Sequence, residues 1–196
     1  MLTEIITIGD ELLIGQVVDT NSAWMAQRLN EIGIKVKQIS SVSDDESHIL
    51  NALLEASLRA DIILITGGLG PTKDDITKKT LCKYFNTGLK FDEESFKIIE
   101  SIFLSRGRQV TPINRLQAEV PENCTVLHNY LGTAPGMWFE HKEKIYVSMP
   151  GVPSEIIVKY STIFRYLCLQ SVYRRYLPTP RKKNRFNNFK RFFIEF

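Results

Sequence analysis

Residues 61–75 read Asp61-Ile-Ile-Leu-Ile-Thr-Gly-Gly-Leu-Gly-Pro-Thr-Lys-Asp-Asp75. A short apolar run that closes on several glycines is typical of a buried strand followed by a sharp turn. Glycine takes positive φ at little cost and lets backbone N–H groups approach an anion closely. The run therefore predicts a strand that ends in a phosphate-binding loop, whose glycines are Gly67, Gly68 and Gly70.

Two carboxylates follow this glycine loop. We expect a helix to begin near Thr72 and to direct its positive dipole end at the bound anion. Asp74 and Asp75 would then lie in the first turn of that helix. They either complement the helix dipole or supply oxygen ligands to a divalent metal that bridges protein and phosphate.

A further pair of carboxylates follows the first predicted strand. Residues 2–8 are rich in β-branched side chains and close on Gly9-Asp10-Glu11. Parallel strands bind ligands at their carboxyl ends, so this turn and the glycine loop would meet at one edge of the sheet. We expect Asp10, Asp74 and Asp75 to be the catalytic carboxylates, with Asp10 and Asp74 as metal ligands.

Strands and helices alternate along the first half of the chain. The predicted strands are residues 2–8, 35–42 and 61–66, separated by a helix capped by Asn21 or Ser22 and a helix capped within residues 43–46. Such alternation gives a mostly parallel sheet with helices on both faces. We therefore predict a three-layer α/β/α fold. Further helices are expected over residues 76–85 and 93–103, and short strands over 124–128, 137–140 and 144–148.

Two common nucleotide-binding motifs are absent from the sequence. A Rossmann NAD site requires G-x-G-x-x-G after the first strand, where this chain has Gly9-Asp10-Glu11. A Walker loop requires Gly-Lys-Ser/Thr, which the loop at Gly67 lacks. The three histidines have no spacing that indicates a metal cluster or a catalytic triad.

Residues 114–118 and 129–136 are rich in glycine, proline and hydrogen-bonding side chains, and could form another wall of the pocket. Gly132 and Gly136 are more simply interpreted as turn residues. Arginines in this region could neutralise phosphate or could be ordinary solvated surface residues; they are Arg106, Arg108 and Arg115.

Composition favours a cytoplasmic protein with one domain and a tail. The three cysteines are widely separated, which indicates neither a disulfide framework nor a zinc site. No leader pattern is visible, and no segment approaches the roughly 18 apolar residues that span a bilayer. Residues 1–158 carry 15 Lys/Arg against 21 Asp/Glu, whereas residues 159–196 carry 10 against 1. We expect a domain over 1–158 and an irregular basic, aromatic tail over 159–196.

Six motifs in order between Thr3 and Glu155 resemble the N-terminal domain of the CinA competence/damage-inducible proteins, which is similar to the MoaB/Mog molybdopterin-binding domain. They are Gly9-Asp-Glu-Leu-Leu-Ile-Gly15, Asp19-Thr-Asn21, Thr66-Gly-Gly-Leu-Gly-Pro-Thr72 with Asp74-Asp75, Asn114 to Ala118, Gly132-Thr-Ala-Pro-Gly136 and Met149-Pro-Gly-Val-Pro-Ser-Glu155. The resemblance implies a three-layer fold with a site at the strand ends.

The resemblance also implies an activity. CinA-type proteins are associated with hydrolysis of ADP-ribose to AMP and ribose 5-phosphate with a divalent metal, so it implies Mg²⁺ or Co²⁺ as cofactor. Mog-type domains bind or adenylylate molybdopterin, so a pterin-binding module without hydrolysis is the alternative. Related domains form symmetric assemblies, and we expect a homo-oligomer. The ligand-binding residues implied by matching motif are Gly67, Gly68, Gly70, Thr72, Asn114, Gln117, Gly132, Pro150 and Gly151.

The resemblance fades after Glu155. Full-length relatives commonly continue into a domain that deamidates nicotinamide mononucleotide, and no deamidase activity is inferred for this chain. The tail has three interpretations: an RNA-binding arm, a membrane-surface segment, or a truncated or frame-shifted terminus. We favour the last, expect neither a membrane nor a nucleic acid as partner, and rank nucleic-acid binding third among the functions.

Overall fold

The computed structural model describes residues 1–70 and 76–155 of the 196-residue chain. Thr72, Asp74, Asp75 and the basic tail lie outside the described residues. In chain order the elements are β1 (Leu2–Ile8), α1 (Asp10–Leu13), α2 (Thr20–Glu31), β2 (Lys35–Val42), α3 (Glu46–Arg59), β3 (Ile62–Thr66), α4 (Ile76–Tyr84), β4 (Leu89–Phe91), α5 (Glu93–Ser105), α6 (Pro112–Leu116), β5 (Glu119–Pro121), β6 (Thr125–Leu127), β7 (Gly136–His141) and β8 (Lys144–Met149).

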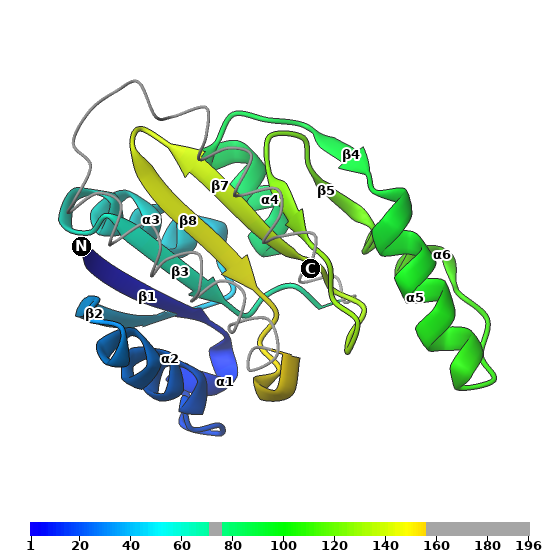
Figure 1. Cartoon of the computed structure of the whole chain (residues 1–196), viewed down its shortest axis with the longest axis horizontal. Helices are drawn as coiled ribbons and strands as arrows, with labels where there is room; N and C mark the ends of the chain where they lie inside the picture. Colours follow the sequence, from blue (N-terminus) through cyan, green and yellow to red (C-terminus); the bar gives the residue numbers. More distant parts are fainter. Residues whose placement is uncertain (71–75, 156–196) are drawn as a thin grey trace.

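A six-stranded sheet in the order β2-β1-β3-β8-β7-β6 forms the centre of the molecule (Figure 1). β1 pairs in parallel with β2 and β3, and β3 pairs in parallel with β8. β7 runs antiparallel to both β8 and β6, so it is the reversed strand among these six. The predicted mostly parallel α/β sheet is confirmed. β7 and β8 form a hairpin that turns through Lys142 and Glu143, both with positive φ.

Apolar side chains cover both faces of this sheet. Ile5 of β1 packs in one buried cluster with Met25 of α2. Ile6, the next residue of the strand, packs in a second cluster with Leu53 of α3 and Leu81 of α4. Successive strand residues point to opposite faces, so β1 is buried on both sides. The predicted three-layer arrangement, with helices on both faces of the sheet, is therefore confirmed (Figure 1).

The start of α2 differs from the prediction. Asp19 caps this helix, and its carboxylate accepts a hydrogen bond from the Ser22 backbone N–H at 2.9 Å. The predicted caps, Asn21 and Ser22, are wrong because the helix already begins at Thr20. The chain leaves the helix through Ile32 and Gly33, and Gly33 has a φ of 74°.

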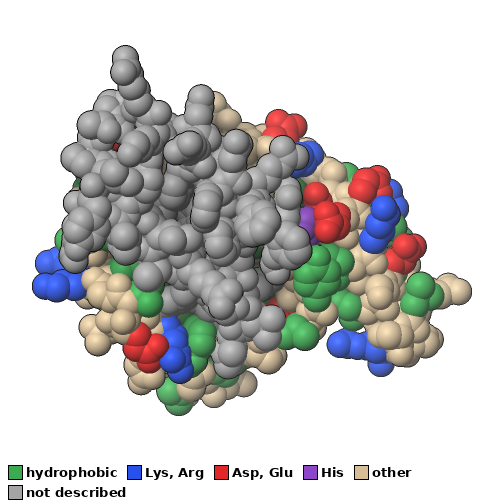
Figure 2. Space-filling model, in the orientation of Figure 1, with side chains coloured by type: hydrophobic (Ala, Val, Ile, Leu, Met, Phe, Trp, Pro, Cys, Tyr) green, Lys and Arg blue, Asp and Glu red, His purple; other side chains and the backbone are tan. Residues whose placement is uncertain are grey.

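A smaller unit extends from one side of the sheet and contains β4, β5, α5 and α6 (Figure 1). β4 and β5 form an antiparallel pair that the sequence did not reveal. The Arg115 guanidinium of α6 lies 4.4 Å from the ring centre of Phe91 and 4.7 Å from that of Phe96. These cation–π contacts join α6 to β4 and α5. Figure 2 shows acidic and basic side chains interspersed over the surface of this smaller unit.

Candidate functional site

The glycine loop lies between the carboxyl ends of β1 and β8. The Gly67 N–H donates to the Met149 carbonyl at 3.2 Å, and Thr66 Oγ1 donates to the Pro150 carbonyl at 3.1 Å. Gly67 has a φ of 102°, and a Cβ there would collide with the carbonyl oxygen of Ile8. Both the backbone angle and the close approach therefore require glycine at this position.

Gly68 is held against the start of α4. Its φ is 64°, and a Cβ there would collide with Thr77 Oγ1. Thr77 is fully buried, and its hydroxyl has no hydrogen-bond partner among the residues that the structure describes. The loop that the sequence predicted to bind phosphate thus packs directly on the first turn of the following helix. Gly70 is exposed at the end of the described loop.

Asp10 and Asp44 lie together at this edge. The Asp10 N–H is 3.3 Å from Asp44 Oδ2, and the Asp44 N–H is 3.3 Å from Asp10 Oδ1. Asp44 Oδ1 is also 3.3 Å from the position of a Cβ on Gly68. Asp10 begins α1, and Asp44 follows β2, so the carboxyl ends of two adjacent strands place both carboxylates beside the glycine loop.

Asp44 was not among the predicted site residues, because residues 43–46 were interpreted only as helix caps. The cap is its neighbour, Asp45, whose carboxylate accepts from Ser47 and from the His48 backbone N–H. These hydrogen bonds, that of the Ser47 hydroxyl foremost, lower the pKa of Asp45. Two consecutive aspartates, one residue after a strand, were the available signal, since one carboxylate suffices to cap a helix.

Pro150 and Gly151 form another side of the site. A Cβ on Gly151 would lie 3.4 Å from Cα of Gly67, so the two loops are in contact. Asn21 Nδ2 donates to the Gly151 carbonyl at 2.7 Å and links α2 to this loop. Asn21, predicted as a helix cap, instead fixes a segment 130 residues away in sequence.

The loop of residues 129–136 is organised by Asn129. Its amide donates to the Ala134 carbonyl at 3.0 Å and to Glu155 at 2.7 Å. Gly132 faces the same carboxylate, since a Cβ there would collide with Glu155 Oε1. The position of Gly132 is thus set by Glu155, which gives this glycine a packing role whatever ligand it meets.

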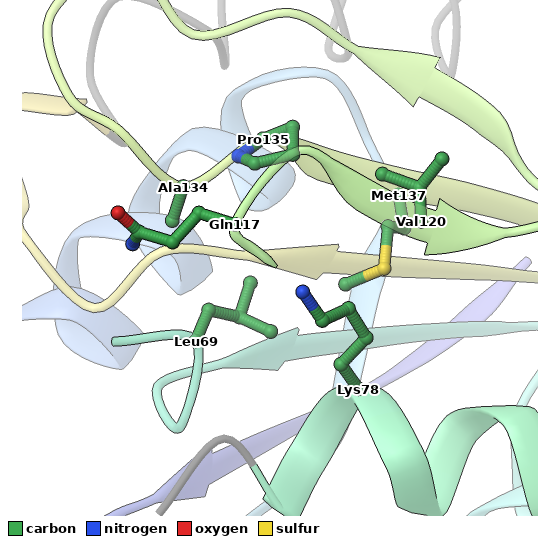
Figure 3. A pocket seen from close by; sticks show the side chains of 7 residues that line it. All are labelled: Leu69, Lys78, Gln117, Val120, Ala134, Pro135 and Met137. Carbon is green, nitrogen blue, oxygen red and sulfur yellow. The ribbon is translucent and has the colours of Figure 1, made fainter. Parts of the chain in front are cut away.

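Asn114 and Gln117 differ sharply in their surroundings. Asn114 belongs to a capping box, in which its side-chain oxygen accepts from the Thr111 backbone N–H at 3.1 Å. Gln117 ends α6, is only 3% exposed, and lines a small pocket (Figure 3). The other residues of the pocket are Leu69, Lys78, Val120, Ala134, Pro135 and Met137. The structure therefore brings Gln117 to the glycine loop through Leu69.

The described carboxylates at this edge do not by themselves complete a metal centre. Within residues 1–70 and 76–155, no group of three or more His, Cys, Asp or Glu side chains is placed to hold a metal ion. Asp10 and Asp44 offer carboxylate oxygens, and Mg²⁺ is commonly held by one or two carboxylates together with substrate phosphate. Asp74 and Asp75 lie outside the described residues, so their role stays a prediction.

Of the helices that the structure describes, none has the length and apolarity needed to cross a membrane.

Comparisons with known proteins agree with this fold. A family model described as a probable molybdopterin binding domain matches residues 4–168. A CinA-like protein of Cytophaga hutchinsonii is 53% identical over 153 residues, which cover 78% of this chain and 37% of that protein. The chain thus spans less than half the length of this curated relative.

Comparison with solved structures also leads to CinA and to molybdopterin biosynthesis proteins. The CinA protein of Thermoplasma acidophilum, titled as a protein of unknown function, matches with a TM-score of 0.76 and 32% identity, over 84% of this chain and 96% of that one. A molybdopterin biosynthesis protein of Mycobacterium abscessus shares the fold, with a TM-score of 0.58 and 19% identity over 88% of this chain and 94% of that one. The chain belongs to the family of probable molybdopterin binding domains, and within it to the CinA-like proteins.

Proposed function

We propose that the protein is a metal-dependent nucleotide pyrophosphohydrolase that cleaves ADP-ribose to AMP and ribose 5-phosphate. The observation that carries this proposal is the placement of Asp10 and Asp44 beside Gly67 and Gly68, at adjacent strand ends. A diphosphate is an anionic ligand, and backbone N–H groups of a glycine loop suit its oxygens. Carboxylates next to that loop would repel the diphosphate unless a cation lies between them.

Each group has a distinct task in this reaction. Hydrolysis adds water across the P–O–P bond: the water oxygen bonds to one phosphorus, and the bridging oxygen leaves with the other phosphate. A carboxylate at this edge accepts the proton of the attacking water. The N–H groups of the glycine loop stabilise charge that develops on the phosphate oxygens. Bound Mg²⁺ or Co²⁺, held by Asp10 and Asp44 and, as the sequence predicts, by Asp74, would neutralise the diphosphate and orient it.

The test is AMP release from ADP-ribose by the purified chain with Mg²⁺ or Co²⁺. Asp10→Asn, Asp44→Asn and Asp74→Ala should each abolish metal-dependent turnover while circular dichroism shows a folded protein. Asp61→Asn is the matched control, because Asp61 accepts from the Leu2 N–H at the opposite end of the strands. Turnover that survives in the Asp44 variant, or an absence of turnover in the folded wild type, contradicts the proposal.

A molybdopterin-binding module without hydrolysis is the second candidate. The match to a probable molybdopterin binding domain supports it, and a phosphorylated pterin would use the same glycine loop. The two candidates differ in one measurable respect. Saturable pterin binding without nucleotide turnover favours the module, and metal-dependent AMP release favours the hydrolase.

A further inference from the structure

The side-chain amide of Gln117 is buried without a hydrogen-bond partner. The residue is 3% exposed, and neither Nε2 nor Oε1 has a partner within the described part of the chain. Leaving a buried donor or acceptor unpaired is costly, and buried polar groups in native proteins are rarely left so. The amide presents one donor group and one acceptor, both without an internal role.

Gln117 lines a small space beside the glycine loop. Figure 3 shows the Gln117 amide at one end of the group of lining side chains, next to Ala134 of the loop after Asn129 and with Leu69 of the glycine loop below it. The pocket has room for about one water molecule. It therefore admits a single polar group of a ligand, such as an exocyclic amine or carbonyl, rather than a whole ring.

Lys78 holds the turn that carries Gln117. Its Nζ donates to the Leu116 carbonyl at 3.1 Å, directly before Gln117 in the chain. Figure 3 shows the Lys78 side chain rising from α4 into the pocket. Lys78 is 7% exposed, so this contact is shielded from solvent and fixes α6 to the helix that follows the glycine loop.

We propose that Gln117 determines ligand specificity by hydrogen-bonding the amino or carbonyl edge of a heterocycle whose phosphate lies on the glycine loop. Adenine has an exocyclic amine at its edge, and a pterin has an exocyclic amine and a carbonyl, so either ring can present one such group to the Gln117 amide. The inference rests on the proposed function only in placing phosphate at Gly67 and Gly68. It assigns Gln117 to recognition, whether or not the bound nucleotide is hydrolysed.

Gln117→Met tests this proposal, because methionine has a similar length and shape without the polar amide. Gln38→Met is the matched control, since Gln38 is exposed on β2 and its amide donates to Ser40. Calorimetric titration uses three probes: AMP, neopterin monophosphate and ribose 5-phosphate, which has a phosphate but no ring. Thermal unfolding without ligand is measured in parallel.

We expect Gln117→Met to keep or raise the midpoint of thermal unfolding, by up to roughly 2–4 °C, because it removes unpaired buried polar atoms. We expect it to weaken binding of AMP or of neopterin monophosphate by about tenfold or more, with ribose 5-phosphate unaffected. Whichever of the two ring ligands, AMP or neopterin monophosphate, loses affinity identifies the class of heterocycle that Gln117 recognises. Gln38→Met should change none of these values.

Several outcomes overturn the proposal. A purely structural glutamine would give a lower unfolding midpoint in Gln117→Met, with unchanged affinity for both ring ligands. An equal loss of affinity for all three probes would place the effect at the phosphate, and no binding of either ring ligand by the wild type would remove the basis for recognition. Amide-dependent binding without AMP release from ADP-ribose would overturn the hydrolase alone and leave this inference standing.

Discussion

The carbonyl oxygen of Ile8 occupies the space where a side chain at residue 67 would have to lie. Gly67 therefore lets the β3 loop pass directly over the end of β1. The Gly67 N–H bonds to Met149 on the other side, so one residue contacts the ends of two strands. The arrangement of the candidate site depends on this contact. Asp10 follows β1 and Pro150 follows β8, so the strand ends that Gly67 contacts also position these two residues.

Gly67→Ala should destabilise the fold through this relationship. Alanine at a φ of 102° is strained, and its Cβ displaces the Ile8 carbonyl, so we expect a loss of about 1–3 kcal/mol in the free energy of unfolding. Gly33→Ala is the control, because Gly33 also has positive φ but open space around it. Urea unfolding measures both variants, and equal losses would contradict a role for the Ile8 contact.

Asn21→Ala should loosen the loop at Pro150 and Gly151. The variant removes the 2.7 Å hydrogen bond to the Gly151 carbonyl, and we expect a loss of about 1 kcal/mol in the free energy of unfolding. Hydrogen exchange of residues 150–155 should become faster, while exchange within α3 stays unchanged. Asn30→Ala, on the same helix and exposed, is the control. Unchanged exchange of residues 150–155 would show that Asn21 does not hold this loop.

Arg59→Met should destabilise the protein more than Arg28→Met. Arg59 makes two hydrogen bonds to Glu4, at 2.8 and 3.1 Å, and the Glu4 side chain is 1% exposed. Removal of Arg59 leaves a buried carboxylate without its counter-ion, whereas the pair of Arg28 with Glu31 is open to solvent. Adding Glu4→Leu to Arg59→Met should restore part of the stability in urea unfolding. A double variant less stable than Arg59→Met would contradict this account.

Asp92→Asn should change how stability depends on pH. Asp92 Oδ2 accepts from the Ser95 N–H at 2.9 Å and lies 3.1 Å from His128 Nε2. Burial raises the pKa of Asp92, but the hydrogen bonds from Ser95 and His128 outweigh burial and hold the pKa below its usual value. The ionised group therefore contributes its full stability above the unfolded-state pKa of about 3.9, and the contribution is lost as pH falls through the lower folded-state pKa.

Asparagine keeps a capping oxygen but loses the charge, so the wild type should be more stable than Asp92→Asn at pH 7 by about 1 kcal/mol. This difference should shrink steadily below about pH 4. Urea unfolding at pH 7, 5 and 3 measures this difference in stability. Glu93→Gln is the control, because Glu93 is an exposed residue of α5, the helix that Asp92 caps. A difference that stays constant down to pH 3 would rule out the charge of Asp92 as its source.

The sequence correctly predicted the elements that have a strong residue pattern, such as a β-branched run between turn residues. β1 and β2 have the predicted bounds, because long β-branched runs end at clear turn residues. The sequence did not reveal β4 or β5, since each has three residues with little apolar alternation and the two strands pair with each other outside the main sheet. The sequence predicted a turn at Gly9-Asp10-Glu11, where the structure has the four-residue helix α1.

For the candidate site, the sequence predicted which residues lie at the same edge of the sheet, but not which of them touch. Asp10, the glycine loop and Gly151 share the expected edge because strand ends place them there. The bond from Asn21 to Gly151 could not be predicted, and the second of two consecutive aspartates was the signal for Asp44, since both contacts depend on segments brought together only by the complete sheet. Local capping rules gave each of these residues a sufficient short-range role, which concealed the long-range one.

The position of β8 in the sheet has a consequence for biosynthesis. β8 inserts between β3 and β7, and its Met149 pairs with Thr66 at the end of β3. A nascent chain leaves the ribosome from its N-terminus, so β1, β2 and β3 are available long before their last parallel neighbour. The glycine loop therefore gains its second wall only when residues 149–151 emerge. Until then, the growing polypeptide exposes the edge of β3, an apolar strand that a chaperone or a neighbouring chain could pair with.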